Sequence, residues 1–148
     1  MRYDKIQEYF NRDEEGVTQL LESCKEMFDT IDDYSSQFIG DILSTSDELR
    51  EAKTRLTGIV ATLQPIYSKA LSVKKQKEYR YYAQQKETLG TSFKDGANEK
   101  LAKDYVRLFR DMRDLLCGYI KAAEALIFDA KDRIEGNRRE YSRVKEEN

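Results

Sequence analysis

The sequence predicts an all-α protein: a long antiparallel helical hairpin plus an N-terminal helix, with coiled-coil-like packing. Charged residues make up 36% of the 148-residue chain and apolar residues 39%. This balance is typical of long helices, in which a narrow apolar stripe accompanies many exposed charges. The chain holds one proline, and apolar residues recur at intervals of three and four over most of its length, which is the periodicity of a helix packed on one face.

The N-terminal region, residues 1–46, is acidic and contains the first predicted helix. We expect Gly16 to separate this helix from a short amphipathic start that carries Ile6, Tyr9 and Phe10. Beyond Gly16 the apolar residues follow 4-3 spacing, with Ser35 as the one polar member. They are Val17, Leu21, Cys24, Phe28, Ile31, Phe38 and Ile42. Such a series predicts a helix whose narrow face packs against other helices.

The second predicted helix starts at Ser46, which we expect to be the N-cap residue ahead of Asp47 and Glu48. Its apolar stripe is formed by Leu49, Ala52, Leu56, Ile59, Leu63, Ile66, Ala70 and Val73. Pro65 lies inside this stripe and removes one backbone hydrogen bond, so we expect a kink near Gln64. The glycines of residues 89–97 predict the loop that closes the hairpin.

The third predicted helix runs from about residue 98 to residue 136 and carries two adjacent apolar seams. One consists of Leu101, Tyr105, Leu108, Met112, Leu115, Tyr119, Ala122 and Leu126. The other consists of Ala102, Val106, Phe109, Leu116, Ile120, Ala123, Ile127, Ala130 and Ile134, interrupted by Arg113. One partner helix cannot cover so broad a face. We therefore expect a homo-oligomer, with a monomeric three-helix bundle as the alternative.

These elements divide the chain into three predicted regions. Residues 1–46 form the acidic N-terminal helical region and residues 47–136 the long hairpin. Residues 137–148 form a polar tail that we expect to fray.

The composition argues against catalysis. The chain contains no histidine, which excludes Ser-His-Asp and Cys-His nucleophiles and His-ligated zinc. Cys24 and Cys117 are far apart in sequence and suit buried apolar positions better than a metal or redox motif. No phosphate-binding loop is present, and acidic neighbours such as Asp32 and Asp33 diverge by about 100° on a helix. We expect a protein that is not an enzyme and that has no cofactor or metal.

The sequence also predicts the location of the protein. Its first residues lack the apolar stretch of a signal peptide, and no run approaches the length of a membrane span. We therefore expect a soluble cytoplasmic protein without a membrane partner, in the host cytoplasm if it is viral.

The net charge of −2 conceals three unequal parts. Residues 1–50 hold five basic and thirteen acidic side chains, and residues 51–100 hold ten basic and five acidic ones. Residues 101–148 hold eleven basic and ten acidic ones. A basic zone within an acidic protein is a candidate binding surface for a polyanion. The alternative is a solvated helix face that pairs with the acidic N-terminal region.

Residues 69–86, which we call the basic-aromatic segment, make the most specific prediction. Its candidate nucleic-acid-binding residues are Lys69, Lys74, Lys75, Lys77, Tyr79, Arg80, Tyr81, Tyr82 and Lys86. Single-stranded nucleic acid suits this combination, because phosphates contact cations and unstacked bases contact flat aromatic rings. In the alternative interpretation the tyrosines cap the end of the hairpin against Phe93, and the lysines are ordinary surface residues.

The order of these features resembles the UvsY-like recombination mediators of bacteriophages. The resemblance covers roughly residues 47–135. It rests on Lys74, Lys75, Lys77, Arg80, Tyr81 and Tyr82, followed by Gly90, Lys94, Asp95 and Gly96. In that family a glycine follows the tyrosine pair closely, whereas residues 83–89 intervene in this chain. The resemblance implies a helical oligomer that binds single-stranded DNA and helps load a RecA-type recombinase onto it.

Two function classes therefore remain open. The first is a single-stranded DNA-binding accessory protein of recombination or replication, with a recombinase as its protein partner. The second is a structural or adaptor coiled-coil protein, such as a virion component or an inhibitor of a host protein, whose apolar seams bind protein.

Overall fold

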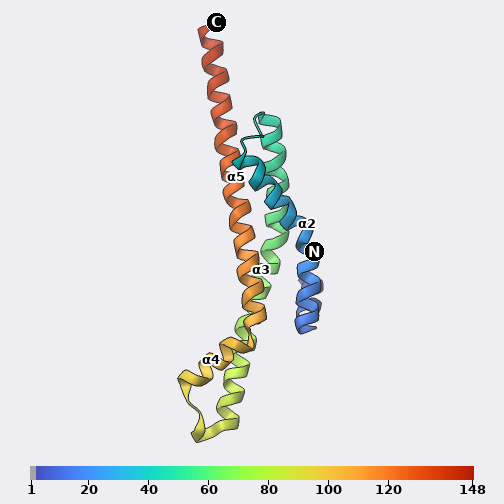
Figure 1. The fold of residues 1–148 in the computed structure, drawn as a ribbon, viewed down its shortest axis with the longest axis vertical. Helices are drawn as coiled ribbons and strands as arrows, with labels where there is room; N and C mark the ends of the chain where they lie inside the picture. Colours follow the sequence, from blue (N-terminus) through green and yellow to red (C-terminus); the bar gives the residue numbers. More distant parts are fainter. Residues whose placement is uncertain (1–2) are drawn as a thin grey trace. The chain divides into compact units, whose positions relative to one another are not determined.

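The computed structural model describes residues 3–148, and every regular element in this range is helical (Figure 1). The predicted all-α fold class is therefore confirmed. In chain order the elements are α1 (Tyr3–Phe10), α2 (Asp13–Ile39), α3 (Ser46–Leu89), the short 3-10 helix η1 (Gly90–Ser92), α4 (Asp95–Tyr105) and α5 (Arg107–Glu147).

The helices build two compact units. The first unit comprises the described residues up to Ser23 together with Pro65–Cys117, and the second comprises Cys24–Gln64 and Gly118–Asn148. Helices α2, α3 and α5 each contribute to both units. The boundary within α3 falls at Pro65, but α3 continues through this residue as one helix. The kink near Gln64 stays a prediction.

The core of the first unit is formed by α1, the start of α2, the later part of α3, α4 and the start of α5. Its largest buried side chains include Ile6, Phe10, Val17, Leu20, Ile66, Val106, Met112 and Leu116. The rings of Phe10 and Phe109 lie 6.0 Å apart. Here α3 runs antiparallel to the chain that follows it, since Tyr82 contacts Phe93 and Tyr81 contacts Tyr105. The predicted hairpin is present in this unit.

In the second unit, α2 packs with the first part of α3 and the later part of α5. Its buried side chains include Cys24, Phe28, Ile31, Phe38, Leu49, Leu56, Leu63 and Ala130. Phe28 and Tyr119 stack with ring centroids 4.2 Å apart, and the Tyr119 hydroxyl donates a hydrogen bond to Asp32 at 3.0 Å. These contacts agree with the prediction that Tyr119 is a packing residue.

The guanidinium of Arg133 caps the C-terminal end of α2 in the second unit. It donates to the Phe38 carbonyl oxygen at 3.2 Å and to the Asp41 carboxylate at 2.9 Å. It also lies 5.0 Å from the centre of the Phe38 ring. A cation is favoured here because the carbonyl groups at the end of a helix have no partner within it.

The first helical break lies before the predicted position. Asn11 and Arg12 separate α1 from α2, and Gly16 is inside α2 rather than between the helices. A side chain at Gly16 would overlap the carbonyl oxygen of Tyr9. Glycine is therefore required because the backbones of α1 and α2 approach closely, not because the helix ends there.

The N-cap of α3 is Thr45 and not Ser46 as predicted. The Thr45 hydroxyl accepts a hydrogen bond from the Glu48 amide at 3.2 Å, and the Glu48 carboxylate accepts one from the Thr45 amide at 3.4 Å. This reciprocal pair is a capping box, for which Thr45 and Glu48 have the required spacing. Ser46 is the first helical residue, and its hydroxyl lies 3.4 Å from the Asn137 side-chain amide.

The third predicted helix is two helices. Val106, which is fully buried, has φ −97° and ψ 14° and interrupts the helix between α4 and α5. The predicted loop at residues 89–97 is shorter, because η1 occupies Gly90–Ser92 and α4 starts at Asp95. The helix α5 continues to Glu147 and most side chains of residues 137–148 are exposed, while the predicted fraying stays a prediction.

Candidate nucleic-acid interface

The basic-aromatic segment lies entirely on α3, in the first unit. The structure divides its nine candidate residues into two groups. Lys74, Lys77, Tyr81 and Tyr82 are engaged with other side chains, and Lys69 is half-buried. Lys75, Tyr79, Arg80 and Lys86 are exposed. The nine residues therefore do not form one continuous binding surface.

Two of the three tyrosines hold the end of the hairpin together. Tyr81 stacks on Tyr105 with centroids 4.6 Å apart and an interplanar angle of 15°. Tyr82 meets the edge of Phe93 at 5.1 Å, and its hydroxyl donates to the Asp95 carboxylate at 2.8 Å. For these two residues the structure agrees with the alternative interpretation, in which tyrosines cap the hairpin.

The Tyr82 hydroxyl has a pKa above its ordinary value. The largest cause is its hydrogen bond to the Asp95 carboxylate, and the negative charge of that group adds to the effect. Both favour the protonated phenol, which is the form that can donate. Tyr82 therefore fastens α3 to the first turn of α4 as a neutral donor.

Two of the lysines have carboxylate partners. Lys74 pairs with Glu78 at 2.9 Å, one helical turn away. Lys77 pairs with Asp13 of α2 at 2.8 Å, and its ammonium group lies 5.2 Å from the centre of the Phe109 ring. For Lys77 the structure agrees with the alternative interpretation, in which the basic zone pairs with the acidic N-terminal region.

The exposed group presents a ring together with unpaired cations. Tyr79 is 73% exposed. No carboxylate within residues 3–148 lies in ion-pair distance of Lys75, Arg80 or Lys86. Lys75, Tyr79 and Lys86 are four and seven residues apart, so they project from one side of α3. Arg80 directly follows Tyr79 and diverges from it by about 100°, so it lies at the edge of this side. We call Lys75, Tyr79, Arg80 and Lys86 the α3 cation-aromatic face.

A hollow of about 250 Å³ opens beside this face, between α3 and α4. It is lined by Lys75, Glu78, Tyr79 and Tyr82 of α3 and by Glu99 and Ala102 of α4. The Glu99 carboxylate pairs with Lys103 at 2.9 Å. Because both carboxylates of the hollow have lysine partners, they oppose an anionic ligand less than free carboxylates would.

Several partners of the basic-aromatic segment were not predicted from sequence. Asp13 of α2 pairs with Lys77, and Asp95 of α4 accepts a hydrogen bond from Tyr82. No sequence pattern at either aspartate predicts these contacts. Tyr105 was assigned to a core seam, but it is 56% exposed and covers Tyr81. Near the end of a hairpin, a residue of an apolar seam has packing partners on one side only. The periodicity of the sequence does not show where the hairpin ends, so it does not predict this exposure.

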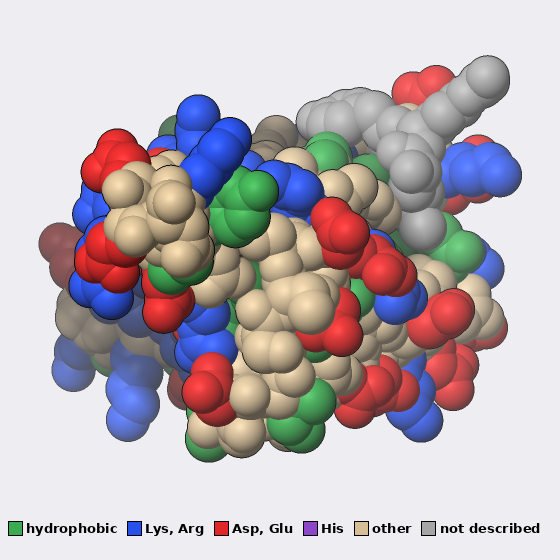
Figure 2. Space-filling view, turned by 90° about the horizontal axis from the view of Figure 1, so that it is seen from above, with side chains coloured by type: hydrophobic (Ala, Val, Ile, Leu, Met, Phe, Trp, Pro, Cys, Tyr) green, Lys and Arg blue, Asp and Glu red, His purple; other side chains and the backbone are tan. Residues whose placement is uncertain are grey.

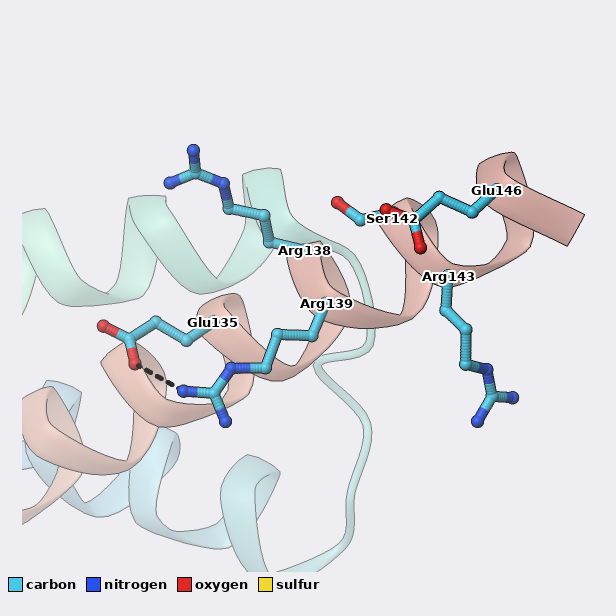
Figure 3. Close-up of a pocket in the computed structure, with 6 residues that line it drawn as sticks. All are labelled: Glu135, Arg138, Arg139, Ser142, Arg143 and Glu146. Atoms are coloured by element: carbon cyan, nitrogen blue, oxygen red, sulfur yellow. Dashed lines mark ion pairs between the residues drawn. The ribbon is translucent and has the colours of Figure 1, made fainter.

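Another hollow lies along the C-terminal part of α5 (Figure 3). Its volume is about 550 Å³, and it is lined by Glu135, Arg138, Arg139, Ser142, Arg143 and Glu146. All six belong to successive turns of one helix, and Arg139 lies 4.0 Å from Glu135. Since no second element among the lining residues closes it, this hollow is the open side of a helix.

The described residues show neither a metal site nor a membrane span. No group of three or more Cys, Asp or Glu side chains within residues 3–148 is placed to hold a metal ion. None of the helices in this range is both long and apolar enough to cross a membrane. Basic and acidic side chains alternate over the face drawn in Figure 2, and hydrophobic side chains form small separate patches on it.

Comparison of the chain with protein-family models, with curated proteins and with solved structures gave no match.

Proposed function

We propose that this protein is a non-enzymatic accessory protein that binds single-stranded DNA through the α3 cation-aromatic face. The observation that carries the proposal is the 73% exposed ring of Tyr79 beside cations without carboxylate partners. An exposed tyrosine offers a stacking surface to any base, and nearby cations neutralise the phosphates that accompany it. Binding of this kind is largely independent of base sequence.

The packed residues of the segment support this function indirectly. Tyr81 and Tyr82 fix the end of α3 against α4, and Lys77 fixes it against α2. These contacts hold the exposed face on an ordered helix. A rigid face binds a flexible strand more tightly than a mobile one would, because less conformational entropy is lost on its side.

The resemblance to UvsY-like mediators extends the proposal to recombination. We propose that the protein, as a homo-oligomer, helps load a RecA-type recombinase onto a strand covered by single-strand-binding protein. An oligomer would multiply a weak site of a few cations and one ring. Strand exchange by a recombinase on covered DNA should then accelerate when this protein is added. Unchanged exchange, with DNA binding intact, would restrict the function to strand binding.

A salt series tests the DNA-binding proposal. Lys75, Arg80 and Lys86 are replaced together by alanine, and binding to a fluorescent single-stranded oligonucleotide is followed by anisotropy between low and moderate salt. Each phosphate contact to a single strand contributes about 0.7 to the slope of log affinity against log salt. The triple variant should therefore lower the magnitude of this slope by about 2.

A matched control distinguishes binding at the α3 cation-aromatic face from binding that depends only on the net charge of the protein. Lys5, Lys25 and Lys121 are exposed and lie outside the segment. Their joint replacement by alanine changes the net charge equally and should leave the slope nearly unchanged. Equal slopes for both triple variants, or no binding by the wild type at low salt, would refute the proposal.

A second function is favoured by a different observation. Several large apolar side chains are exposed, among them Ile39 at 85%, Ile42 at 67% and Phe128 at 66%. Exposed apolar residues of this size suit contacts with another protein, as in the adaptor interpretation. If Phe128→Ser abolishes self-association or capture of a protein partner while oligonucleotide binding is absent throughout, the adaptor function is the better explanation.

A further inference from the structure

The second unit contains a groove between α3 and α5. Four of its lining residues, Arg50, Lys53, Thr54 and Thr57, belong to α3, and Ile134 belongs to α5. The volume of the groove is about 490 Å³. At the start of α3, the Asn137 amide of α5 donates to the Ser44 carbonyl oxygen at 3.2 Å and to the Ser46 hydroxyl at 3.4 Å.

Cations recur along the side of α5 that carries Ile134. Lys131, Arg138 and Lys145 are spaced by seven residues, which is about two turns of helix or about 10.5 Å along its axis. Ile134 and Tyr141 are also seven residues apart, and each lies between two of these cations on nearly the same side of the helix. Tyr141 is 72% exposed.

Figure 3 shows the C-terminal part of this helix, with Arg138 extending away from Arg139 and Arg143. Arg139 is directed to Glu135 on the same helix. Arg138 thus differs from its neighbour in having no carboxylate partner among the described residues.

The cations at the groove are mostly without partners. Within residues 3–148 no carboxylate lies in ion-pair distance of Lys53, Lys131 or Arg138. Arg50 pairs only with Asp47 at 3.3 Å, and the two side chains are 63% and 95% exposed. Such an exposed pair is weak and competes poorly with an incoming phosphate.

Of the three acidic side chains in this part of α3, Asp47 pairs with Arg50 and the other two lie elsewhere. Glu48 and Glu51 line a separate hollow with Asp33 and Tyr34 of α2. Carboxylates therefore gather where α3 meets α2, and cations gather where α3 meets α5. This separation places basic side chains at the α3–α5 groove, although the second unit as a whole holds eleven basic and fifteen acidic side chains.

We infer that the α3–α5 groove is a second site for single-stranded nucleic acid, independent of the α3 cation-aromatic face. Phosphates contact Arg50, Lys53 and Arg138, and a base stacks on Tyr141. Lys53 and the weakly paired Arg50 on α3, together with Arg138 on the side of α5 that carries Ile134, match a polyanion. The exposed ring of Tyr141 on that side of α5 suits an unstacked base. The inference shares only its ligand class with the proposed function, and each unit of the chain would then hold its own stretch of strand.

The test replaces Arg50, Lys53 and Arg138 together by alanine in the full-length protein. Oligonucleotide binding is measured against salt in parallel with the Lys75, Arg80 and Lys86 variant. The groove variant should lower the magnitude of the salt slope by about 2, which is the contribution of three phosphate contacts. Tyr141→Ala should weaken binding by roughly tenfold at low salt, and Tyr141→Phe should not.

The outcomes of this test are distinct. An unchanged slope for the groove variant, with a lowered slope for the α3 variant, would overturn the second site and keep the proposed function. The reverse pattern would support the groove and overturn the α3 face. Binding of the wild type to phosphatidylserine vesicles but to no oligonucleotide would overturn both, and circular dichroism with thermal melting checks that each variant is folded.

Discussion

Gly16 is a position at which the close approach of one backbone oxygen requires glycine. The backbone of α1 turns at Asn11 and Arg12 and returns so closely that the Tyr9 carbonyl oxygen occupies the space a side chain at Gly16 would need. The amide of Arg12 bonds to the same oxygen at 3.1 Å. Glycine resembles a helix breaker in the sequence, but here it permits close packing within the first unit.

The first prediction concerns two glycines. Gly16→Ala should lower the free energy of unfolding by about 1–3 kcal/mol, because a backbone atom must move to accept the methyl group. Gly118→Ala is the control, since nothing lies within 4 Å of the added methyl group. It should raise the free energy of unfolding by about 0.5–1 kcal/mol, because alanine favours the helix. Urea unfolding measures both, and changes of the same sign would contradict the packing described.

Tyr119 of the second unit has a pKa that folding raises. Its pKa lies above the ordinary value of about 10, first because the ring is buried and then because its hydroxyl donates to Asp32. The folded chain therefore keeps this proton at pH values where the unfolded chain loses it. The stabilisation from this group is complete below pH about 10 and is lost as pH rises through the raised pKa.

The second prediction concerns this loss of stability at high pH. The free energy of unfolding of the wild type should fall as the pH rises above about 10, and Tyr119→Phe should reduce the part of the fall due to this residue. Tyr141→Phe, at an exposed ring, serves as the control for the loss of a tyrosine hydroxyl. Urea unfolding at each pH supplies the values, and an identical decline in all three proteins would be inconsistent with the raised pKa.

Among the elements, long amphipathic stretches were predictable and short-range exceptions were not. The α3 stripe from Leu49 to Val73 is buried almost as predicted, because burial on one face imposes the helical period. The interruption at Val106 has no glycine or proline to announce it. Its geometry is decided by how α4 and α5 each pack on α3, which is information that neighbouring residues in sequence do not carry.

The start of α3 could have been predicted from sequence by the capping-box spacing instead of by the type of the N-cap residue alone. Thr45, Ser46 and Asp47 are all acceptable N-cap residues, but only Thr45 has a glutamate three positions later. The reciprocal hydrogen bonds of Thr45 and Glu48 follow from that spacing.

The third prediction tests this cap. Thr45→Ala should lower the free energy of unfolding by about 1 kcal/mol, because the Glu48 amide loses its acceptor. Thr45→Ser retains a hydroxyl and should restore most of the stability. Chemical denaturation compares the two variants with the wild type. Equal losses for alanine and serine would show that the hydroxyl is not the stabilising group.

On the scale of the whole molecule, the sequence predicts which residue types form the candidate binding surface, but it does not predict which of them are accessible to a ligand. The sequence places lysines and tyrosines together on residues 69–86, but packing removes Tyr81, Tyr82 and Lys77 from the accessible set. Their partners come from distant parts of the chain, which only folding brings near. The opposite holds for the α3–α5 groove, whose cations are scattered in sequence and meet only because the helices run antiparallel.

The central claim is that Tyr79 stacks with bases of a bound single strand. The chain contains no tryptophan, so Tyr79→Trp places a unique indole on the α3 cation-aromatic face. Titration with a single-stranded oligonucleotide at low salt should quench its fluorescence in step with the anisotropy of the labelled strand, and added salt should reverse both. Strand binding that leaves the indole emission unchanged would contradict the claim.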